Sequence, residues 1–202
     1  MHSLIKEIRA IAQTGLHYVQ DPFDKERYER LAAISHELYA MYSQADLKTI
    51  EHFFFPDKGY ATPKVDLRCC IIKEGKVLLV KEKSDGKWTM PGGWADQNEA
   101  PLEGITREVQ EEAGYTIKNC RLYAVKDRDS HPYTPKFPTT IYKLFFVAEA
   151  GNGHFTENTE ISELGFFSPE QLPELSEDRI LAEDITAGFN AINQPVISVS
   201  VD

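Results

Sequence analysis

The stretch from Gly92 to Tyr115 constrains the fold most, because it joins a glycine pair to a strongly patterned helix. Gly92 and Gly93 leave the backbone bare for close approach by other groups. A helix is predicted from Pro101, where a first-turn proline is tolerated, to Gly114, which is a typical C-terminal cap. Its apolar positions recur at steps of three and four and form one stripe: Leu102, Ile105, Val109 and Ala113.

Three glutamates flank that stripe at positions 108, 111 and 112. Residues three and four apart share one side of a helix, so these like charges repel each other and destabilise the helix. A divalent cation would reverse the sign of the effect, because carboxylates suit hard ions. A solvated acidic face is the simpler interpretation. The glycine pair, Glu99 and Arg107 stand at fixed distances from the acids, however, and favour a site. Arg107 is expected to pair with Glu99, mainly as a structural ion pair that holds the loop against the helix.

This stretch resembles the Nudix box, the signature of the Nudix hydrolases. The residues that match at the family's spacing are Gly93, Glu99, Arg107, Glu108, Val109, Glu111, Glu112 and Gly114. Two positions depart from the pattern, since Tyr115 replaces an aliphatic residue and Ala100 stands where Ser or Thr often caps. Neither departure touches the metal chemistry. The resemblance implies hydrolysis of nucleoside diphosphates linked to another moiety, with bound divalent metal.

The resemblance also implies a metal site made of oxygen atoms. Glu108, Glu111 and Glu112 would supply the carboxylates, and the carbonyl of Gly92 or Gly93 a further ligand. The implied cofactor is Mg²⁺ or Mn²⁺. Bound metal would neutralise the pyrophosphate charge, orient the attacking water and lower its pKa.

The general base is predicted less directly. In this family it comes from a glutamate of the box or from a carboxylate on a loop near the strand before the C-terminal helix. The matching loop here spans 156–163. We favour Glu160 and then Glu163, with Glu111 or Glu112 acting through metal-bound water as the alternative.

A wider resemblance covers nearly the whole chain. About sixty helical residues, joined through GYATPKVDLR and followed by EKSDGKWTMPGGWAD, are similar to a bacterial subfamily often labelled ADP-ribose pyrophosphatase, which includes CDP-choline pyrophosphatases. It implies an N-terminal helical domain over residues 1–60 and a Nudix domain over 64–202. Members of this subfamily are dimers, so the resemblance implies a homodimer.

The N-terminal region is predicted to be all-helical. Helices are expected over 3–16, over 24–42 with Asp24 as N-cap, and over 46–54. Leu4, Ile5, Ile8, Ile11 and Ala12 should share one side of the first helix, and Tyr28, Leu31, Ile34, Leu38 and Met41 should face inward from the second. The cluster Phe53–Phe55 adds a large apolar surface. These helices would act as an intramolecular brace or as a dimer interface, and the resemblance favours the interface.

The second region is predicted to alternate strands with two substantial helices. That pattern is typical of an α/β fold with a sheet between helices, and it agrees with the Nudix α/β/α sandwich with a mixed sheet. The C-terminal tail is expected to fray or to dock as an edge strand. The expected elements are a hairpin over 65–72 and 76–83, strands over 115–117, 122–125, 139–148 and 164–167, a short strand through Phe155, and a last helix over 177–192.

Composition narrows the functional classes. The net charge of −10 argues against broad binding to nucleic acid or to an anionic membrane. No apolar run approaches membrane-spanning length, and MHSLIKEIRA is too charged for a signal peptide. The three cysteines are odd in number, and the adjacent Cys69 and Cys70 would point to opposite faces of a strand. A reduced cytoplasmic protein with packed thiols is therefore expected.

Substrate recognition is expected from the loop over 126–138, which combines cations with aromatic rings. Its ends are predicted to be tied to the core and its middle free to contact ligand. An ordinary exposed loop is the alternative. The candidate substrate-binding residues are Arg68, Lys126, His131, Tyr133 and Phe137.

The sequence thus predicts a metal-dependent pyrophosphohydrolase that acts on a small-molecule nucleotide of the NDP-X type, such as ADP-ribose or CDP-choline. A MutT-type nucleoside triphosphate pyrophosphohydrolase is the alternative within enzymes. A non-catalytic Nudix-fold regulator that binds a nucleotide is the alternative from another class. The complete box argues against the regulator, because such modules can lose their metal carboxylates.

Overall fold

A computed structural model describes residues 1–43 and 58–202 of the chain. The chain divides into two compact units. The first comprises residues 1–63 together with 137–140, and the second comprises 64–136 and 141–202. The expected helix over 46–54 and the cluster Phe53–Phe55 lie outside the described residues.

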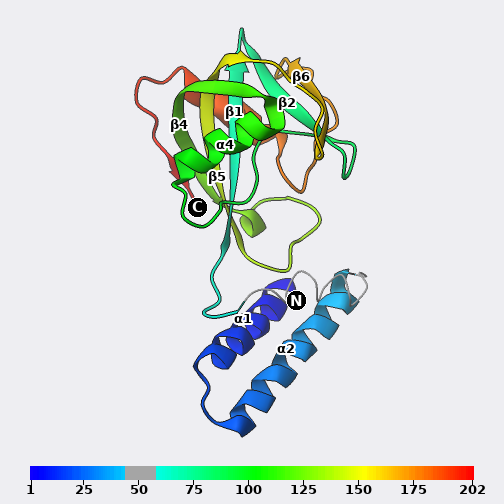
Figure 1. The fold of residues 1–202 in the computed structure, drawn as a ribbon. Helices are drawn as coiled ribbons and strands as arrows, with labels where there is room; N and C mark the ends of the chain where they lie inside the picture. Colours follow the sequence, from blue (N-terminus) through cyan, green and yellow to red (C-terminus); the bar gives the residue numbers. More distant parts are fainter. Residues whose placement is uncertain (44–57) are drawn as a thin grey trace. The chain divides into compact units, whose positions relative to one another are not determined.

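The first unit contains two antiparallel helices, α1 (His2–Tyr18) and α2 (Pro22–Ser43) (Figure 1). Both helices were predicted from periodicity, but the N-cap of α2 was wrong by three residues. The Asp21 carboxylate accepts hydrogen bonds from the backbone N–H groups of Phe23 (2.9 Å) and Asp24 (3.0 Å). Pro22 is the first residue of the helix. A proline is tolerated at this position because it lacks only an N–H that would be unpaired there.

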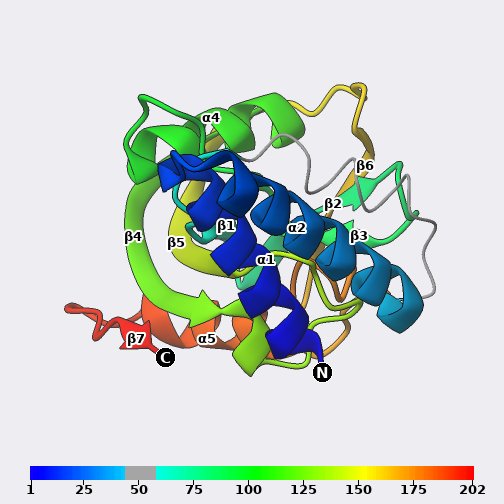
Figure 2. The ribbon, with the colours of Figure 1, turned by 90° about the horizontal axis from the view of Figure 1, so that it is seen from below.

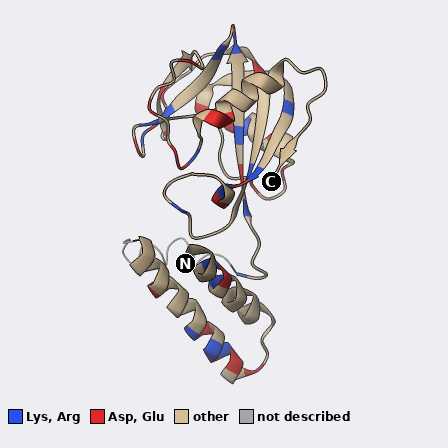
Figure 3. Cartoon of the chain, turned by 180° about the vertical axis from the view of Figure 1, so that it is seen from behind, with Lys and Arg blue, Asp and Glu red and all other residues tan. Residues whose placement is uncertain are grey.

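The predicted inward faces of these helices are only partly correct. Ile5 and Ala12 are buried as expected, whereas Leu4 and Ile11 are more than half exposed. On α2 the side chain of Met41 is exposed, whereas Ser35, His36 and Tyr39, which were not predicted to face inward, are buried. The first half of α2 carries acidic and basic side chains interspersed along its length (Figure 3). Its exposed ion pairs, such as Arg27–Asp24 at 2.5 Å, are of the kind that stabilises a protein little.

The second unit is built on one mixed sheet of seven strands. The hydrogen-bonded order is β3-β2-β1-β5-β4-β7, and β6 pairs with β2 away from this path. β1 runs parallel to β5 and β7 parallel to β4, while the other pairs are antiparallel. The strands are β1 (Lys64–Lys73), β2 (Lys76–Glu82), β3 (Trp88–Thr89), β4 (Tyr115–Asp127), β5 (Ile141–Gly153), β6 (Ile161–Phe167) and β7 (Ser200–Val201).

Two helices cover opposite faces of this sheet, α4 (Pro101–Ala113) and α5 (Ala182–Ile192) (Figure 2). Side chains alternate between the faces along a strand. Cys69 accordingly packs in the core cluster on the α4 side and Cys70 in the cluster on the α5 side, as predicted. The α/β/α sandwich with a mixed sheet is confirmed. Within the described residues, no helix is long and apolar enough to cross a membrane.

Several predicted elements differ in extent. The hairpin turns through Glu74 and Gly75, both at positive φ, as a two-residue turn between right-twisted strands prefers. The two strand segments expected after the box helix form the single long strand β4. Phe155 lies outside any strand, and the last helix begins at Ala182, five residues later than expected. The tail docks as the short edge strand β7, one of the two alternatives.

Asp184 holds α5 to the sheet through a buried carboxylate. Its oxygens accept hydrogen bonds from the Tyr133 hydroxyl (2.8 Å), the Lys126 ammonium (2.7 Å) and the Leu181 N–H (2.8 Å). The side chain of Asp184 is fully buried. A buried carboxylate is tolerated only when paired and hydrogen-bonded, and here three donors from three segments satisfy it.

We expect Asp184→Ala to lower the free energy of unfolding by about 3 kcal/mol or more, because it leaves the Tyr133 hydroxyl and the Lys126 ammonium without their buried partner. Urea denaturation of the full chain measures the loss. The matched control is Glu183→Ala, which removes an exposed partner of the same Lys126 and should cost less than about 1 kcal/mol. Equal losses in the two variants would show that burial of Asp184 is not what matters.

Candidate active site

The glycine loop is bound to β1 along its backbone. The Leu67 N–H donates to the Gly93 carbonyl (2.8 Å), and the Cys69 N–H donates to the Pro91 carbonyl (2.9 Å). Gly92 has φ +144°, and a Cβ at this position would overlap the carbonyl of Leu67. The loop thus fills the place of a strand beside β1, and only glycine fits at its centre.

Glu112 projects from α4 into this loop. Its Oε2 accepts a hydrogen bond from the Gly92 N–H (2.8 Å), and only 6% of the residue is exposed. Burial raises the pKa of the Glu112 carboxyl to about 8, against the lowering effect of the nearby Arg68 guanidinium. Nearby Glu82 and Glu108 raise this pKa further, because like charges disfavour ionisation.

Glu108 lies one turn earlier on the same face of α4. A Cβ added to Gly93 would stand 3.0 Å from its Oε1, so the carboxylate lies directly against the glycine loop. Burial raises the pKa of Glu108, although the Arg107 guanidinium lowers it. Two partly desolvated carboxylates therefore converge on the glycine loop.

Arg107 binds the remaining acids of the box. Its Nη2 and Nε donate to the two carboxylate oxygens of Glu99 at 2.8 Å and 3.1 Å, which is the pairing expected from the sequence. Its Nη1 donates to Glu108 (2.9 Å) and to Glu111 (3.0 Å). Glu111 remains exposed at the outer edge of the site. The bidentate contact fixes the loop before α4 against the helix.

The three glutamates predicted as metal ligands come from one helix but do not converge on one point. Among the described residues, no three His, Cys, Asp or Glu side chains are arranged as a metal site. The Glu111 carboxylate pairs with Arg107, and the Glu112 carboxylate pairs with the Gly92 N–H. The donor set nevertheless fits a hard divalent cation, because it offers only oxygen atoms and two carboxylates whose burial disfavours their charged form.

The register of β6 separates the two loop candidates for the general base. Glu163 is opposite Lys81 on β2 and pairs with its ammonium at 2.8 Å. Glu163 lies on the same face as Phe167, which packs in the α5-side core, whereas Glu112 belongs to α4 on the other face. Glu160 precedes β6 and stays exposed. The geometry thus favours Glu160 over Glu163.

Sequence reasoning missed Glu82 at the end of β2. The residue is 8% exposed, and its Oε1 pairs with the Arg179 Nε at 3.2 Å. Burial raises the pKa of Glu82, Arg179 and Arg68 lower it, and Glu160 raises it. Glu82 therefore lies in the same electrostatic neighbourhood as Glu112 and Glu160. The local sequence Lys-Glu-Lys carries no signal for this, because it is also typical of an exposed strand end.

Arg68 and Lys126, two of the cations predicted to bind substrate, are already paired with acids. Arg68 is buried, with Nη2 2.9 Å from the Asp66 carboxylate and Nη1 donating to the Met90 carbonyl. Lys126 pairs with Asp184 and Glu183.

His131 lies between the carboxylates of Glu183 (3.3 Å) and Asp202 (2.9 Å). Like Arg68 and Lys126, it would have to release or share its partners to meet a phosphate.

The loop over 126–138 is not free in its middle, contrary to expectation. Tyr133 is fully buried, donates its hydroxyl to Asp184 and packs in the α5-side core. Its ring is therefore a core element and does not offer a stacking surface in this conformation. Phe137 belongs to the first unit, whereas Tyr133 belongs to the second.

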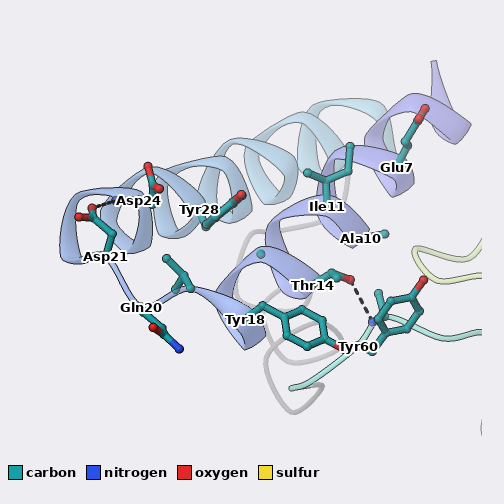
Figure 4. Close-up of a pocket in the computed structure, with 13 residues that line it drawn as sticks. Glu7, Ala10, Ile11, Thr14, Tyr18, Gln20, Asp21, Asp24, Tyr28 and Tyr60 are labelled. Atoms are coloured by element: carbon teal, nitrogen blue, oxygen red, sulfur yellow. Dashed lines mark hydrogen bonds between the residues drawn. The ribbon is translucent and has the colours of Figure 1, made fainter.

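A separate cavity of about 850 Å³ lies in the first unit between α1 and the start of α2 (Figure 4). Tyr18, Tyr28 and Tyr60 line it, but so do three carboxylates, those of Glu7, Asp21 and Asp24. No Lys, Arg or His is among its lining residues. Such a lining repels a polyphosphate, so the candidate site remains the one at the glycine loop.

Comparison with protein families assigns both parts of the chain. Residues 62–187 match the NUDIX domain, and residues 2–54 match a UDP-X-like, N-terminal oligomerisation domain. The chain therefore belongs to the Nudix family and is a Nudix hydrolase.

Individual relatives cover most of the chain. It is 37% identical over 190 residues to "Putative ADP-ribose pyrophosphatase YjhB" of Bacillus subtilis (strain 168), covering 94% of this chain and 91% of the relative. A crystal structure of a UDP-X diphosphatase superposes with a TM-score of 0.64 and 34% identity, covering 99% of this chain and 97% of that one. An ADP-ribose pyrophosphatase from Streptococcus suis 89-1591 gives the same TM-score with 33% identity, covering 70% and 100%.

Gly92→Ala should destabilise the protein for two reasons. The alanine would have to adopt an unfavourable positive φ, and its Cβ would also clash with the carbonyl of Leu67. The matched control is Gly75→Ala, which has φ +73° but nothing within 4 Å of the added Cβ, and should cost about 1–2 kcal/mol. Thermal melts of the two variants compare the losses. A Gly92→Ala variant as stable as Gly75→Ala would mean that the loop is not bound to β1 as described.

Proposed function

We propose that this Nudix hydrolase cleaves the pyrophosphate bond of a nucleoside diphosphate linked to another moiety, with a divalent metal. The observation that carries the proposal is the pair of desolvated carboxylates, Glu108 and Glu112, set against the glycine loop of a complete Nudix box. An acidic, partly desolvated pair of carboxylates of this kind is suited to a cation that in turn meets a polyphosphate.

Each residue of the site then has a part. Glu108, Glu111 and Glu112 would hold Mg²⁺ or Mn²⁺, with the Gly92 or Gly93 carbonyl as a further ligand. When bound, the metal supplies charge neutralisation and an activated water. The ion pair between Arg107 and Glu99 holds the loop before α4 against the helix. Glu160, which is exposed and directly precedes β6, would accept the proton of the attacking water.

We infer the substrate class from the relatives whose alignments cover most of this chain. The relative named as an ADP-ribose pyrophosphatase and the structure named as a UDP-X diphosphatase both span nearly the whole chain. The relative named as a putative 8-oxo-dGTP diphosphatase covers only 48% of it. This difference favours an NDP-X compound, such as ADP-ribose, a UDP-linked compound or CDP-choline, over the MutT-type triphosphate reaction. The complete box disfavours the non-catalytic regulator.

Divalent metal should be required for turnover. Incubation with ADP-ribose, UDP-sugars, CDP-choline and nucleoside triphosphates, with products identified by mass, should give a nucleoside monophosphate from an NDP-X compound in Mg²⁺ or Mn²⁺. Excess EDTA should abolish it. Turnover that is undiminished in EDTA would refute the mechanism.

The same assay tests Glu112. Glu112→Gln should lower kcat at least about 100-fold, because it removes a carboxylate that would hold the metal. The protein should still fold, because the amide keeps the shape of the side chain. Glu103→Gln is the matched control, since it removes a charge from the first turn of the same helix, outside the site. If Glu112→Gln keeps a tenth of the wild-type activity, the site has been misassigned.

We also propose a homodimer and a cytoplasmic location. The match of residues 2–54 to an oligomerisation domain supports assembly through the N-terminal helices. Exposed Leu4, Ile11 and Tyr18 on α1 offer apolar surface for it. Light scattering on the full chain should give the mass of two chains. The double variant Leu4→Glu, Ile11→Glu should shift that mass toward the mass of one chain. If the double variant keeps the mass of two chains, this face of α1 is not the interface.

A further inference from the structure

Asn158, in the segment between β5 and β6, uses every hydrogen bond that its side-chain amide can make. Its Nδ2 donates to the carbonyls of Glu111 (3.0 Å) and Glu112 (3.3 Å). Its Oδ1 accepts from the N–H groups of Glu160 (3.0 Å) and Ile161 (2.8 Å). An amide offers two donors and an oxygen with two lone pairs, so the group is fully paired.

The two donated bonds fall on the end of α4. The last four carbonyls of a helix have no partner within the helix. Here the Gly114 N–H donates to the Gln110 carbonyl at 3.0 Å. The Asn158 amide donates to the next two carbonyls of the helix. Those two carbonyls belong to Glu111 and Glu112, whose side chains are in the candidate metal site. The amide therefore binds the turn of α4 that carries these glutamates.

The two accepted bonds fall on the segment that carries Glu160. Lys83 adds to them, because its N–H donates to the Glu160 carbonyl (2.8 Å) and its ammonium donates to the Asn158 carbonyl (2.6 Å). The backbone of Glu160 is thus held at both its N–H and its carbonyl, while the side chain stays exposed. A fixed backbone with a free carboxylate is what a proton acceptor at an open site requires.

We propose that Asn158 is a positioning residue for the reaction, which holds the Glu160 carboxylate in place relative to the side chains of Glu111 and Glu112. The inference rests on the proposed function. One planar amide joins the two segments directly, so a shift of either one is transmitted to the other. Aspartate has the same shape but no donor, and its charge would stand against two carbonyl oxygens at the negative end of a helix.

A double-mutant cycle with Glu160 tests the proposal. Asn158→Ala should lower kcat about 10- to 100-fold, since small displacements of a reacting group have effects of this size, and change KM less than about threefold. Asn158→Asp keeps the acceptor but loses both donors, and should lower kcat as much. In a Glu160→Gln background, adding Asn158→Ala should change kcat less than about twofold, because the residue acts through Glu160.

The matched control is Asn193→Ala. Asn193 also donates its side-chain amide to a carbonyl at the end of a helix, that of Phe189 on α5 (3.5 Å). Its loss should leave kcat and KM unchanged. Thermal melts of all variants separate loss of folded protein from loss of kcat. Hydrogen exchange adds a readout independent of turnover, since Asn158→Ala should speed exchange at Glu160 and Ile161.

Three outcomes would overturn the proposal. Additive effects of Asn158→Ala and Glu160→Gln would show that Asn158 does not act through Glu160. Unchanged kcat in Asn158→Ala with faster exchange would show that the link is merely structural. Absence of turnover in the unsubstituted protein, for every nucleotide and metal, would overturn the proposed function and this inference together, whatever the exchange rates show.

Discussion

The hydrogen bond from the Gly92 N–H to the buried Glu112 carboxylate joins the two halves of the site. It forms only because β1 holds the glycine loop from one side and α4 packs on the sheet beside it. Leu67, Cys69 and Ile71 on β1 pack in one cluster with Ile105 and Val109 of α4. The apolar stripe of the helix therefore fixes the direction in which its acidic face points, and burial of that face makes a cation favourable there.

The sequence was most informative where spacing along one element decides the outcome. The limits of α4, its cap at Gly114 and the pairing of Arg107 with Glu99 follow from local spacing. The burial of Tyr133 was not predicted, because its hydroxyl is paired with Asp184, fifty-one residues later in the chain. Aromatic residues in a polar loop predict an exposed surface only when no distant partner buries them. The exposed Leu4 and Ile11 of α1 show the same limit, since helical spacing alone does not say which side another segment covers.

The acidic net charge is distributed so that most of the candidate cations are already neutralised. Arg68 pairs with Asp66, which Lys143 also contacts, and Lys126 pairs with Asp184. The pKa of Asp66 is held below its usual value by Arg68 and Lys143, against the raising effect of its burial. These charges hold the sheet, the loop and α5 together. A polyphosphate would then depend mainly on bound metal for neutralisation, because Arg68 and Lys126 already have carboxylate partners.

The positions of Glu160 and Glu163 show how one irregularity in a strand can separate two neighbouring acids. β6 pairs with β2 through a bulge beside Lys81 and Glu82. Beyond it, Glu163 joins Phe167 on the α5 side, and Leu164 and Phe166 pack on the α4 side. A regular strand would place Glu163 on the same face as the buried Ile161, toward α4. The sequence ranked Glu160 before Glu163 without placing either on a face of the sheet, because a bulge leaves no mark in the periodicity of so short a segment. The bulge turns Glu163 away, and Asn158 fixes the backbone of Glu160 at the end of α4 instead.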